Sequence, residues 1–183
     1  MPLVPKPDAR TVERFRTLLL PHVDAAYGYA RWLTGNPTDA QDVVQEALLK
    51  ALHYFHSFHG EAARPWLLGI VRNTWVDLKA RNGPEQLPMD VLEQRAAEDQ
   101  SPEQNALAGD RRRQVAAALA ALPKDLREVV VLREIEDLSY RQIATALDVP
   151  IGTVMSRIAR ARQRLAIELK NRLERRDHGL PDL

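Results

Sequence analysis

The stretch that decides the fold is "LSYRQIATALDVPIGTVMSRIARARQRL", residues 138–165. Its first part predicts a short helix, because apolar residues recur there at helical spacing as Ile143, Ala144 and Leu147. Its second part predicts a longer helix with one apolar stripe, formed by Val154, Ile158, Ala161 and Leu165. Two helices joined by a tight turn make a helix-turn-helix unit, in which the second helix enters the major groove of DNA.

Polar residues mark the ends of these two helices. Ser139 is placed to cap the first helix and Thr153 to cap the second. Asp148 stands in the turn between them, and Asp tolerates the left-handed backbone region better than most residues. The turn therefore needs no glycine.

The second helix carries polar and basic groups away from its apolar stripe. Ser156, Arg160 and Gln163 fall on the far side, and Arg157 and Arg164 flank the stripe. A solvated basic face is the alternative, but the preceding helix and turn favour DNA binding, with arginine pairing to guanine or phosphate. The candidate DNA-binding residues of this helix are Thr153, Ser156, Arg157, Arg160 and Arg164.

Helical periodicity extends over most of the chain outside this stretch, and no alternating strand pattern is present. The further expected helices cover residues 12–33 (with a kink or restart at Pro21), 39–56, 64–81, 110–122 and 124–134. Residues 84–108 lack this periodicity and contain three prolines, which is typical of a linker. We therefore predict an all-α chain with two small helical domains, at 13–83 and 109–176, joined by a linker at 84–108.

The formal net charge of +1 hides two opposed segments. Between Glu85 and Asp110, seven acidic residues face a single arginine, whereas between Thr153 and Arg176 eight basic residues face two glutamates. The linker is therefore acidic and the last helix basic, which suits an anionic partner for the helix.

Composition excludes several classes of protein. There is no cysteine, which removes disulfides, thiol catalysis and thiolate metal sites and is typical of a reducing compartment. No apolar run approaches the roughly 18 residues that a membrane span needs, and the proline-containing start does not resemble a signal peptide. We expect a cytoplasmic protein without membrane insertion.

The expected helix at 39–56 has an acidic stripe. Asp39, Asp42 and Glu46 lie within about 60° of one another on a helical wheel, opposite the apolar residues. Phosphates would repel these carboxylates, so they predict either contact with a basic protein surface or simple solvation. The pattern alone favours solvation.

"RPWLLGIVRNTWVDLKAR", residues 64–81, combines apolar, aromatic and basic residues. Its candidate core residues are Trp66, Leu67, Ile70, Val71 and Val76. Its candidate nucleic-acid contacts are Arg72, Asn73, Trp75, Lys79 and Arg81, because basic groups hold phosphates and aromatic rings stack on unpaired bases. For Trp75, core packing and base stacking remain equally open.

Catalytic and metal-binding motifs are weak. His53, His56 and His59 form an HxxHxxH pattern, but no carboxylate completes a ligand set and surface histidines are the better interpretation. We find no phosphate-binding glycine loop and no persuasive nucleophile–base or paired-carboxylate arrangement. We therefore expect no enzymatic activity, no metal and no cofactor.

Three blocks together resemble the extracytoplasmic-function (ECF) subfamily of bacterial RNA polymerase sigma factors, in the sigma-70 family. They are "DAQDVVQEALLKAL", "RPWLLGIVRNTWVDLKAR" and the segment from "LPKDLREVVVL" to "RARQRL", which occur in the family's order over most of residues 13–170. The resemblance implies a sigma2-like and a sigma4-like domain, and a factor that binds core RNA polymerase and directs promoter-specific initiation. It also implies control by an anti-sigma factor.

The resemblance assigns roles to the candidate residues. Docking on the clamp helices of the largest polymerase subunit falls to Asp39, Asp42, Gln45 and Glu46. Opening of the −10 element and capture of a flipped base fall to Arg72 and Asn73, near Trp75, with Lys79 and Arg81 on phosphates. Recognition of the −35 element falls to the helix from Thr153 to Arg164, in a domain that also meets the polymerase flap.

A stand-alone helix-turn-helix regulator with an N-terminal sensing or dimerising bundle is the rival hypothesis. It needs neither the acidic stripe at 39–46 nor the "WLLGIVRN" block, so these two features favour the sigma factor. A recombinase-like enzyme would need a nucleophile or metal-binding carboxylates in register, which the sequence does not show.

Overall fold

The computed structural model describes residues 8–60, 62–82 and 114–177, and these residues form helices and short turns without any strand. The predicted all-α class is confirmed. The acidic linker expected at 84–108 lies outside the described residues. Within the described ranges, no helix is both long and apolar enough to span a bilayer.

Residues 8–60 and 62–82, the described part of the N-terminal domain, form four α-helices and two 3₁₀ turns. They are α1 (Ala9–Leu19), η1 (Leu20–His22), α2 (Val23–Thr34), α3 (Pro37–Tyr54), η2 (Phe55–Ser57) and α4 (Ala63–Asn82). Pro21 lies in η1, so the restart expected there is confirmed. Gly35, at φ 74°, ends α2 in the left-handed conformation, and the Asn36 side chain caps α3 by accepting from two backbone N–H groups.

The C-terminal domain begins, in the described part, with a helix at 114–121. It continues with α7 (Lys124–Val130), the π-helical turn η3 (Val131–Ile135), α8 (Tyr140–Leu147) and α9 (Ile151–Asp177). The Arg127 guanidinium holds the end of the first helix by donating to the carbonyls of Leu119, Ala120 and Leu122 at 2.9, 2.6 and 2.9 Å. These bonds satisfy carbonyls that a helix end otherwise leaves unpaired.

The helix-turn-helix unit formed by α8 and α9 follows the sequence prediction with one correction. Ser139 caps α8 in a reciprocal capping box with Gln142, and Asp148 turns the chain at φ 52°. The expected Thr153 cap is wrong, because α9 already begins at Ile151 and Thr153 lies in its first turn. The carbonyl of Pro150 accepts the first helical hydrogen bonds, including one from the Thr153 N–H at 2.9 Å.

Side chains of both domains share one hydrophobic core. Tyr29, Leu67 and Val71 from α2 and α4 belong to the same buried cluster as Leu132 and Ile143 from η3 and α8. Trp66 packs against this cluster, but the expected core residue Val76 is 38% exposed and lies outside it. A smaller second cluster holds α7 and α9 together: Leu119, Leu122, Leu126, Val130 and Ala161.

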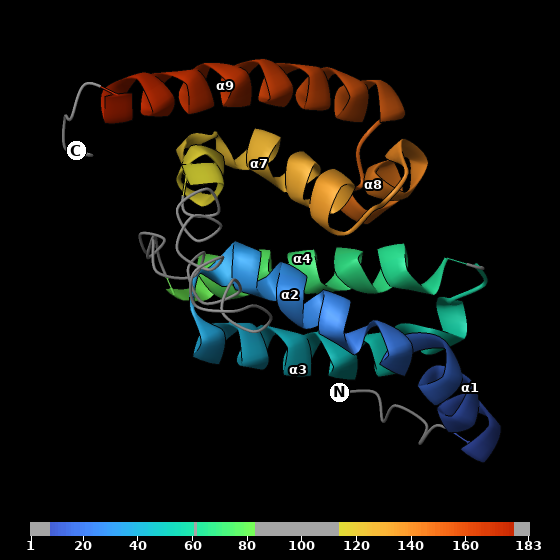
Figure 1. Cartoon of the computed structure of the whole chain (residues 1–183). Helices are drawn as coiled ribbons and strands as arrows, with labels where there is room; N and C mark the ends of the chain where they lie inside the picture. Colours follow the sequence, from blue (N-terminus) through green and yellow to red (C-terminus); the bar gives the residue numbers. More distant parts are fainter. Residues whose placement is uncertain (1–7, 61, 83–113, 178–183) are drawn as a thin grey trace, which may run out of the picture.

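The helices are stacked so that α4 faces the C-terminal domain. In Figure 1, α9 lies at one side, α7 and α8 lie beneath it, and α2, α4 and then α3 follow. Gly69 of α4 makes this approach possible, because a Cβ atom at that position would lie 3.0 Å from the carbonyl oxygen of Ala146 in α8. The candidate −10 block on α4 therefore lies directly against the second domain.

Candidate nucleic-acid interface

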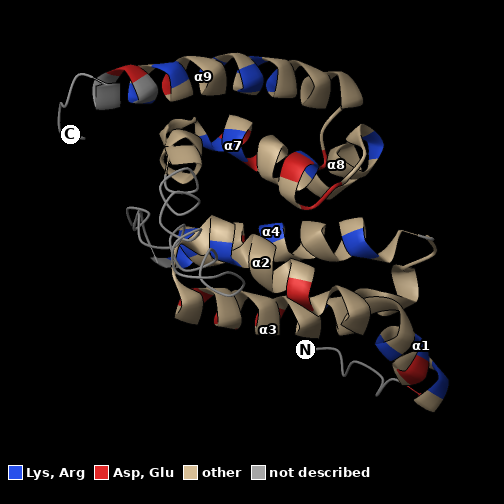
Figure 2. Cartoon of the chain, in the orientation of Figure 1, with Lys and Arg blue, Asp and Glu red and all other residues tan. Residues whose placement is uncertain are grey.

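The recognition helix α9 buries its apolar stripe and presents its predicted polar groups. Val154, Ile158 and Ala161 are fully buried against the domain. Ser156, Arg160 and Arg164 are exposed, and Thr153 is half-buried near the start of the helix. Figure 2 shows basic residues along α9. The exposed hydroxyl and guanidinium groups can donate hydrogen bonds to phosphates and base edges.

Two arginines of α9 are engaged within their own domain. Arg157 pairs with Asp125 of α7 at 3.6 Å, and Arg162 pairs with Glu134 at 2.9 Å. Arg157 was predicted as a DNA contact, and in this arrangement its guanidinium is partly held by α7. The hydrogen bond that Arg162 donates to the Glu134 carboxylate raises the pKa of Arg162, so this arginine stays charged.

Arg72, the central residue of the candidate −10 block, reaches across to the second domain. Its Nε donates to Oε1 of Glu128 in α7 at 2.9 Å. Its Nη1 lies 3.5 Å from Oδ1 of Asn73, which is exposed. The structure thus brings Arg72 and Asn73 together, as predicted, but it commits Arg72 to a protein carboxylate.

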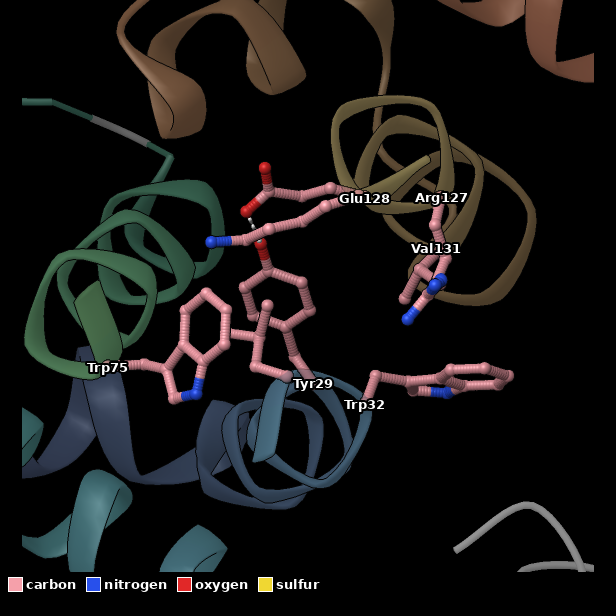
Figure 3. A pocket seen from close by; sticks show the side chains of 8 residues that line it. Tyr29, Trp32, Trp75, Arg127, Glu128 and Val131 are labelled. Carbon is pink, nitrogen blue, oxygen red and sulfur yellow. Dashed lines mark hydrogen bonds between the residues drawn. The ribbon is translucent and has the colours of Figure 1, made fainter. Parts of the chain in front are cut away.

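Glu128 is a buried carboxylate, 5% exposed, that two donors of the N-terminal domain share. The hydroxyl of Tyr29 in α2 donates to the same Oε1 atom at 3.0 Å. Burial, together with the negative charge of Glu128, raises the pKa of Tyr29 well above its ordinary value, so the phenol remains a proton donor. Figure 3 shows the Tyr29 hydroxyl pointing at the Glu128 carboxylate.

Trp75 is buried beside this group, with 7% of its surface exposed. The ammonium of Lys124 lies 3.8 Å from the centroid of its ring, a cation–π contact across the two domains. Burial lowers the pKa of Lys124, and the nearby charges of Arg72 and Lys79 lower it further against the opposing effect of Glu128. Of the two alternatives for Trp75, this arrangement shows packing at the domain interface.

A second interdomain ion pair lies at the other end of α4. Arg64 donates to Oε2 of Glu136 at 2.7 Å, and Glu136 is 2% exposed. Because Arg64 and Arg72 pair with Glu136 and Glu128 in opposite order, α4 runs antiparallel to the segment from α7 through η3. Of the side chains in the contact between the two domains, the sequence singled out only Arg72 and Trp75. It missed Tyr29, Arg64, Lys124, Glu128 and Glu136.

One signal could have indicated Glu128. It precedes Leu132 by four residues, which places a carboxylate on the same helical face as a core leucine. A carboxylate is almost never buried without a partner, so this position predicts a cation or a hydroxyl opposite it.

The acidic stripe of α3 is on the surface. Asp39, Asp42 and Gln45 are exposed, whereas Glu46 is half-buried and pairs with Lys50 at 3.3 Å. Lys50 also binds Asp77 of α4 at 2.9 Å, and these hydrogen bonds raise its pKa against the effect of burial. The predicted docking residues therefore form one exposed surface, with Glu46 tied to α4 through Lys50.

The acidic stripe and the candidate −10 block meet at a surface pocket of about 160 Å³. Lys79 is half-buried here and Arg81, further along α4, is exposed. The residues that line the pocket are Thr34, Asp39, Asp42, Val43, Trp75, Leu78 and Lys79. Both signs of charge and one aromatic ring thus border the same hollow.

The three histidines lie at the end of α3 and in the turn after it, all exposed. His56 Nδ1 lies 3.0 Å from the backbone oxygen of His53. Within the described ranges, no three His, Cys, Asp or Glu side chains gather as metal ligands would.

Two family models match the chain. Sigma-70 region 2 matches residues 18–85, and Sigma-70 region 4 matches residues 112–165. The first includes the acidic stripe and most of the domain that carries α4, and the second includes the helix-turn-helix unit.

Two similar proteins are both ECF RNA polymerase sigma factors. The ECF RNA polymerase sigma factor SigE of Mycolicibacterium smegmatis is 36% identical over 165 residues, 86% of this chain and 62% of that protein. The ECF RNA polymerase sigma-E factor of Escherichia coli K12 is 38% identical over 135 residues, 68% of this chain and 71% of that protein. The chain thus spans less than two thirds of the length of the first relative.

Two solved structures resemble most of the chain. The sigma factor RpoE in complex with the anti-sigma factor NepR, from Bartonella quintana, has a TM-score of 0.69 at 28% identity over 86% of this chain and 98% of that one. CnrH in complex with the cytosolic domain of CnrY has a TM-score of 0.62 at 27% identity over 87% of this chain and 90% of that one.

Proposed function

The chain belongs to the ECF subfamily of bacterial RNA polymerase sigma factors, and from this premise we propose that it binds core RNA polymerase and directs initiation at specific promoters. The observation that carries the proposal is the pair of sigma-70 matches in the family's order, on the two domains with the expected surfaces. We propose residues 13–83 as the sigma2-like domain, 84–108 as the linker and 109–176 as the sigma4-like domain.

The exposed acidic stripe of α3 is the proposed polymerase-docking surface. Asp39, Asp42 and Gln45 are open to a partner, and Glu46 borders them. Phosphates would repel these carboxylates, so their partner is a basic protein surface, for which the family suggests the clamp helices of the largest subunit.

The C-terminal half of α4 is the proposed −10 surface. Arg72, Asn73 and Trp75 would take the flipped base and adjacent backbone, and Lys79 and Arg81 would hold phosphates. Strand opening then needs no chemistry by the protein, because base capture and phosphate contacts offset unstacking costs of a few kcal/mol. We accordingly propose a non-enzymatic role.

The exposed face of α9 is the proposed −35 surface. Ser156, Arg160 and Arg164 face outward on a helix whose opposite side is fixed by buried apolar residues, which supports the major-groove assignment. Thr153 and Arg157 would join them, the latter after exchanging Asp125 for a phosphate.

Control by an anti-sigma factor is supported by the similar structure of the sigma factor RpoE, which is in complex with the anti-sigma factor NepR. We propose that this chain is held inactive in the same manner. The role implies a cytoplasmic location, where the polymerase works.

The docking assignment is tested by reversing one charge of the stripe. Asp42→Lys should weaken association with core polymerase at least about tenfold, because a repulsive contact replaces an attractive one. Asp24→Lys is the matched control, since Asp24 is an exposed acid on α2 outside the stripe. Equal co-purification of both variants with core polymerase would refute the assignment.

A further inference from the structure

We propose that Glu128 is an intramolecular latch that keeps the −10 surface closed until the two domains separate. In the closed arrangement the carboxylate takes the place of a DNA phosphate on Arg72. The inference rests on the proposed function, because it concerns when the α4 surface becomes available to DNA.

The contacts of Glu128 are those expected of a phosphate substitute. Its Oε1 accepts from the Nε of Arg72 at 2.9 Å and from the Tyr29 hydroxyl at 3.0 Å. Arginine binds carboxylate and phosphate oxygens with the same donor geometry, so both anions compete for Arg72. While Glu128 accepts from the Nε of Arg72, this donor is not available to a phosphate of promoter DNA.

The same contact covers the aromatic residue of the surface. The Lys124 ammonium of α7 lies 3.8 Å from the centroid of the Trp75 ring, and only 7% of Trp75 is exposed. A base cannot stack on Trp75 while Lys124 occupies the ring face. Masking therefore applies to Trp75 and Arg72 together, whereas Asn73 and Arg81 of the −10 surface are exposed.

The interface carries unsatisfied polar groups, which favours a second state. At the contact between Arg64 and Glu136, the buried Nε of Arg64 and Oε1 of Glu136 have no hydrogen-bond partner among the described residues. Buried polar groups without partners cost free energy, so separation of the domains relieves part of the cost of opening. Ion pairs and packing hold the closed state together, but some of its buried polar groups lack hydrogen bonds.

The other two proposed surfaces remain accessible in the closed state. Asp39 and Asp42 of the docking surface are exposed, and so are Ser156 and Arg160 of the recognition helix. Polymerase can therefore bind the closed protein first, and the −10 surface becomes available only when the domains move to their separate binding sites. The latch would prevent the isolated factor from binding single-stranded DNA.

Two variants open the latch by different means. Glu128→Gln removes the charge that holds Arg72, and Gly69→Leu inserts a side chain where even a Cβ lies 3.0 Å from the Ala146 carbonyl. Since the chain has no cysteine, spin labels on introduced Gln41→Cys and Gln163→Cys report the interdomain distance. A fluorescein-labelled single-stranded 12-mer of mixed sequence reports access to the −10 surface.

We expect both variants to lengthen and broaden the label distances and to bind the 12-mer about tenfold more tightly, which corresponds to about 1.4 kcal/mol. Adding Arg72→Ala to Glu128→Gln should abolish the gain, because Arg72 is the group released. Glu134→Gln is the matched control: it also releases an arginine, but one paired within a single domain. Gly152→Leu is the control for Gly69→Leu, since a Cβ there has no atom within 4 Å.

Unchanged distances in both folded variants would overturn the latch. Longer distances without tighter binding of the 12-mer would overturn the masking. The proposed function fails separately, if holoenzyme with Arg72→Ala opens promoter DNA as well as the unmodified holoenzyme does.

Discussion

The Tyr29→Phe variant removes one hydroxyl group from the interior where the two domains meet. Tyr29 is fully buried, and its hydroxyl donates to Glu128 Oε1 at 3.0 Å. The variant keeps the ring in the core, and Arg72 still donates to Oε1 of Glu128 at 2.9 Å. It thus isolates the contribution of a single hydrogen bond to a buried charge.

The magnitude follows from the charge of the acceptor. Hydrogen bonds to charged groups contribute about 1.5–3 kcal/mol. Because Arg72 still donates to the same oxygen, we expect the lower half of this range, about 2 kcal/mol. In a chain of this size that loss lowers the melting temperature by about 4–8 °C.

Urea denaturation followed by circular dichroism measures the change, with Tyr54→Phe as the matched control. Tyr54 is 51% exposed, so loss of its hydroxyl should cost less than about 0.5 kcal/mol. Equal stability of the two variants would refute the conclusion that the Tyr29–Glu128 bond holds the domains together.

Two further predictions concern the C-terminal domain. Arg127→Met should destabilise the protein by about 2 kcal/mol in the same assay, because the carbonyls of Ala120 and Leu122 lose the donor that Arg127 supplies and the Leu119 carbonyl keeps only the Leu122 N–H. If this variant is no more destabilising than Arg141→Met, an exposed control, the guanidinium does not hold that helix end. Arg160→Ala should weaken binding of the holoenzyme to a guanine-containing −35 element by about 1–3 kcal/mol in a promoter-binding titration. An equal loss on unrelated sequences would mean that Arg160 contacts only phosphate.

Most of the helical architecture could be predicted because it follows local rules. The 3.6-residue period located the helices, and Ser139 and Asp148 mark the helix-turn-helix unit through their own capping and backbone preferences. Thr153 shows where such rules fail. Pro150 and Thr153 both suit the start of a helix, and the structure uses Pro150: its carbonyl accepts the first helical hydrogen bonds, so α9 begins at Ile151.

The contact between the domains could not be predicted, since it depends on pairs far apart in the chain. Arg72 and Glu128 are 56 residues apart and Arg64 and Glu136 are 72 apart, and many other pairs of opposite charge were equally compatible with the sequence. Trp75 illustrates the consequence: its neighbours on α4 do not show whether a base or another domain covers it.

The surface roles were assigned by residue chemistry and family resemblance, and the structure adds which groups are accessible. Asp42 and Arg160 are exposed, whereas Arg72 is engaged by Glu128. A periodicity argument places a side chain on a face but does not say what the fold brings against that face.

Transcription by core RNA polymerase, with the purified chain added, tests the central claim most directly. New start sites mapped across genomic DNA should share upstream −35 and −10 elements, and they should disappear when the chain is left out. If no start sites appear while the chain alone binds duplex DNA tightly, the protein is a stand-alone helix-turn-helix regulator and the account is contradicted.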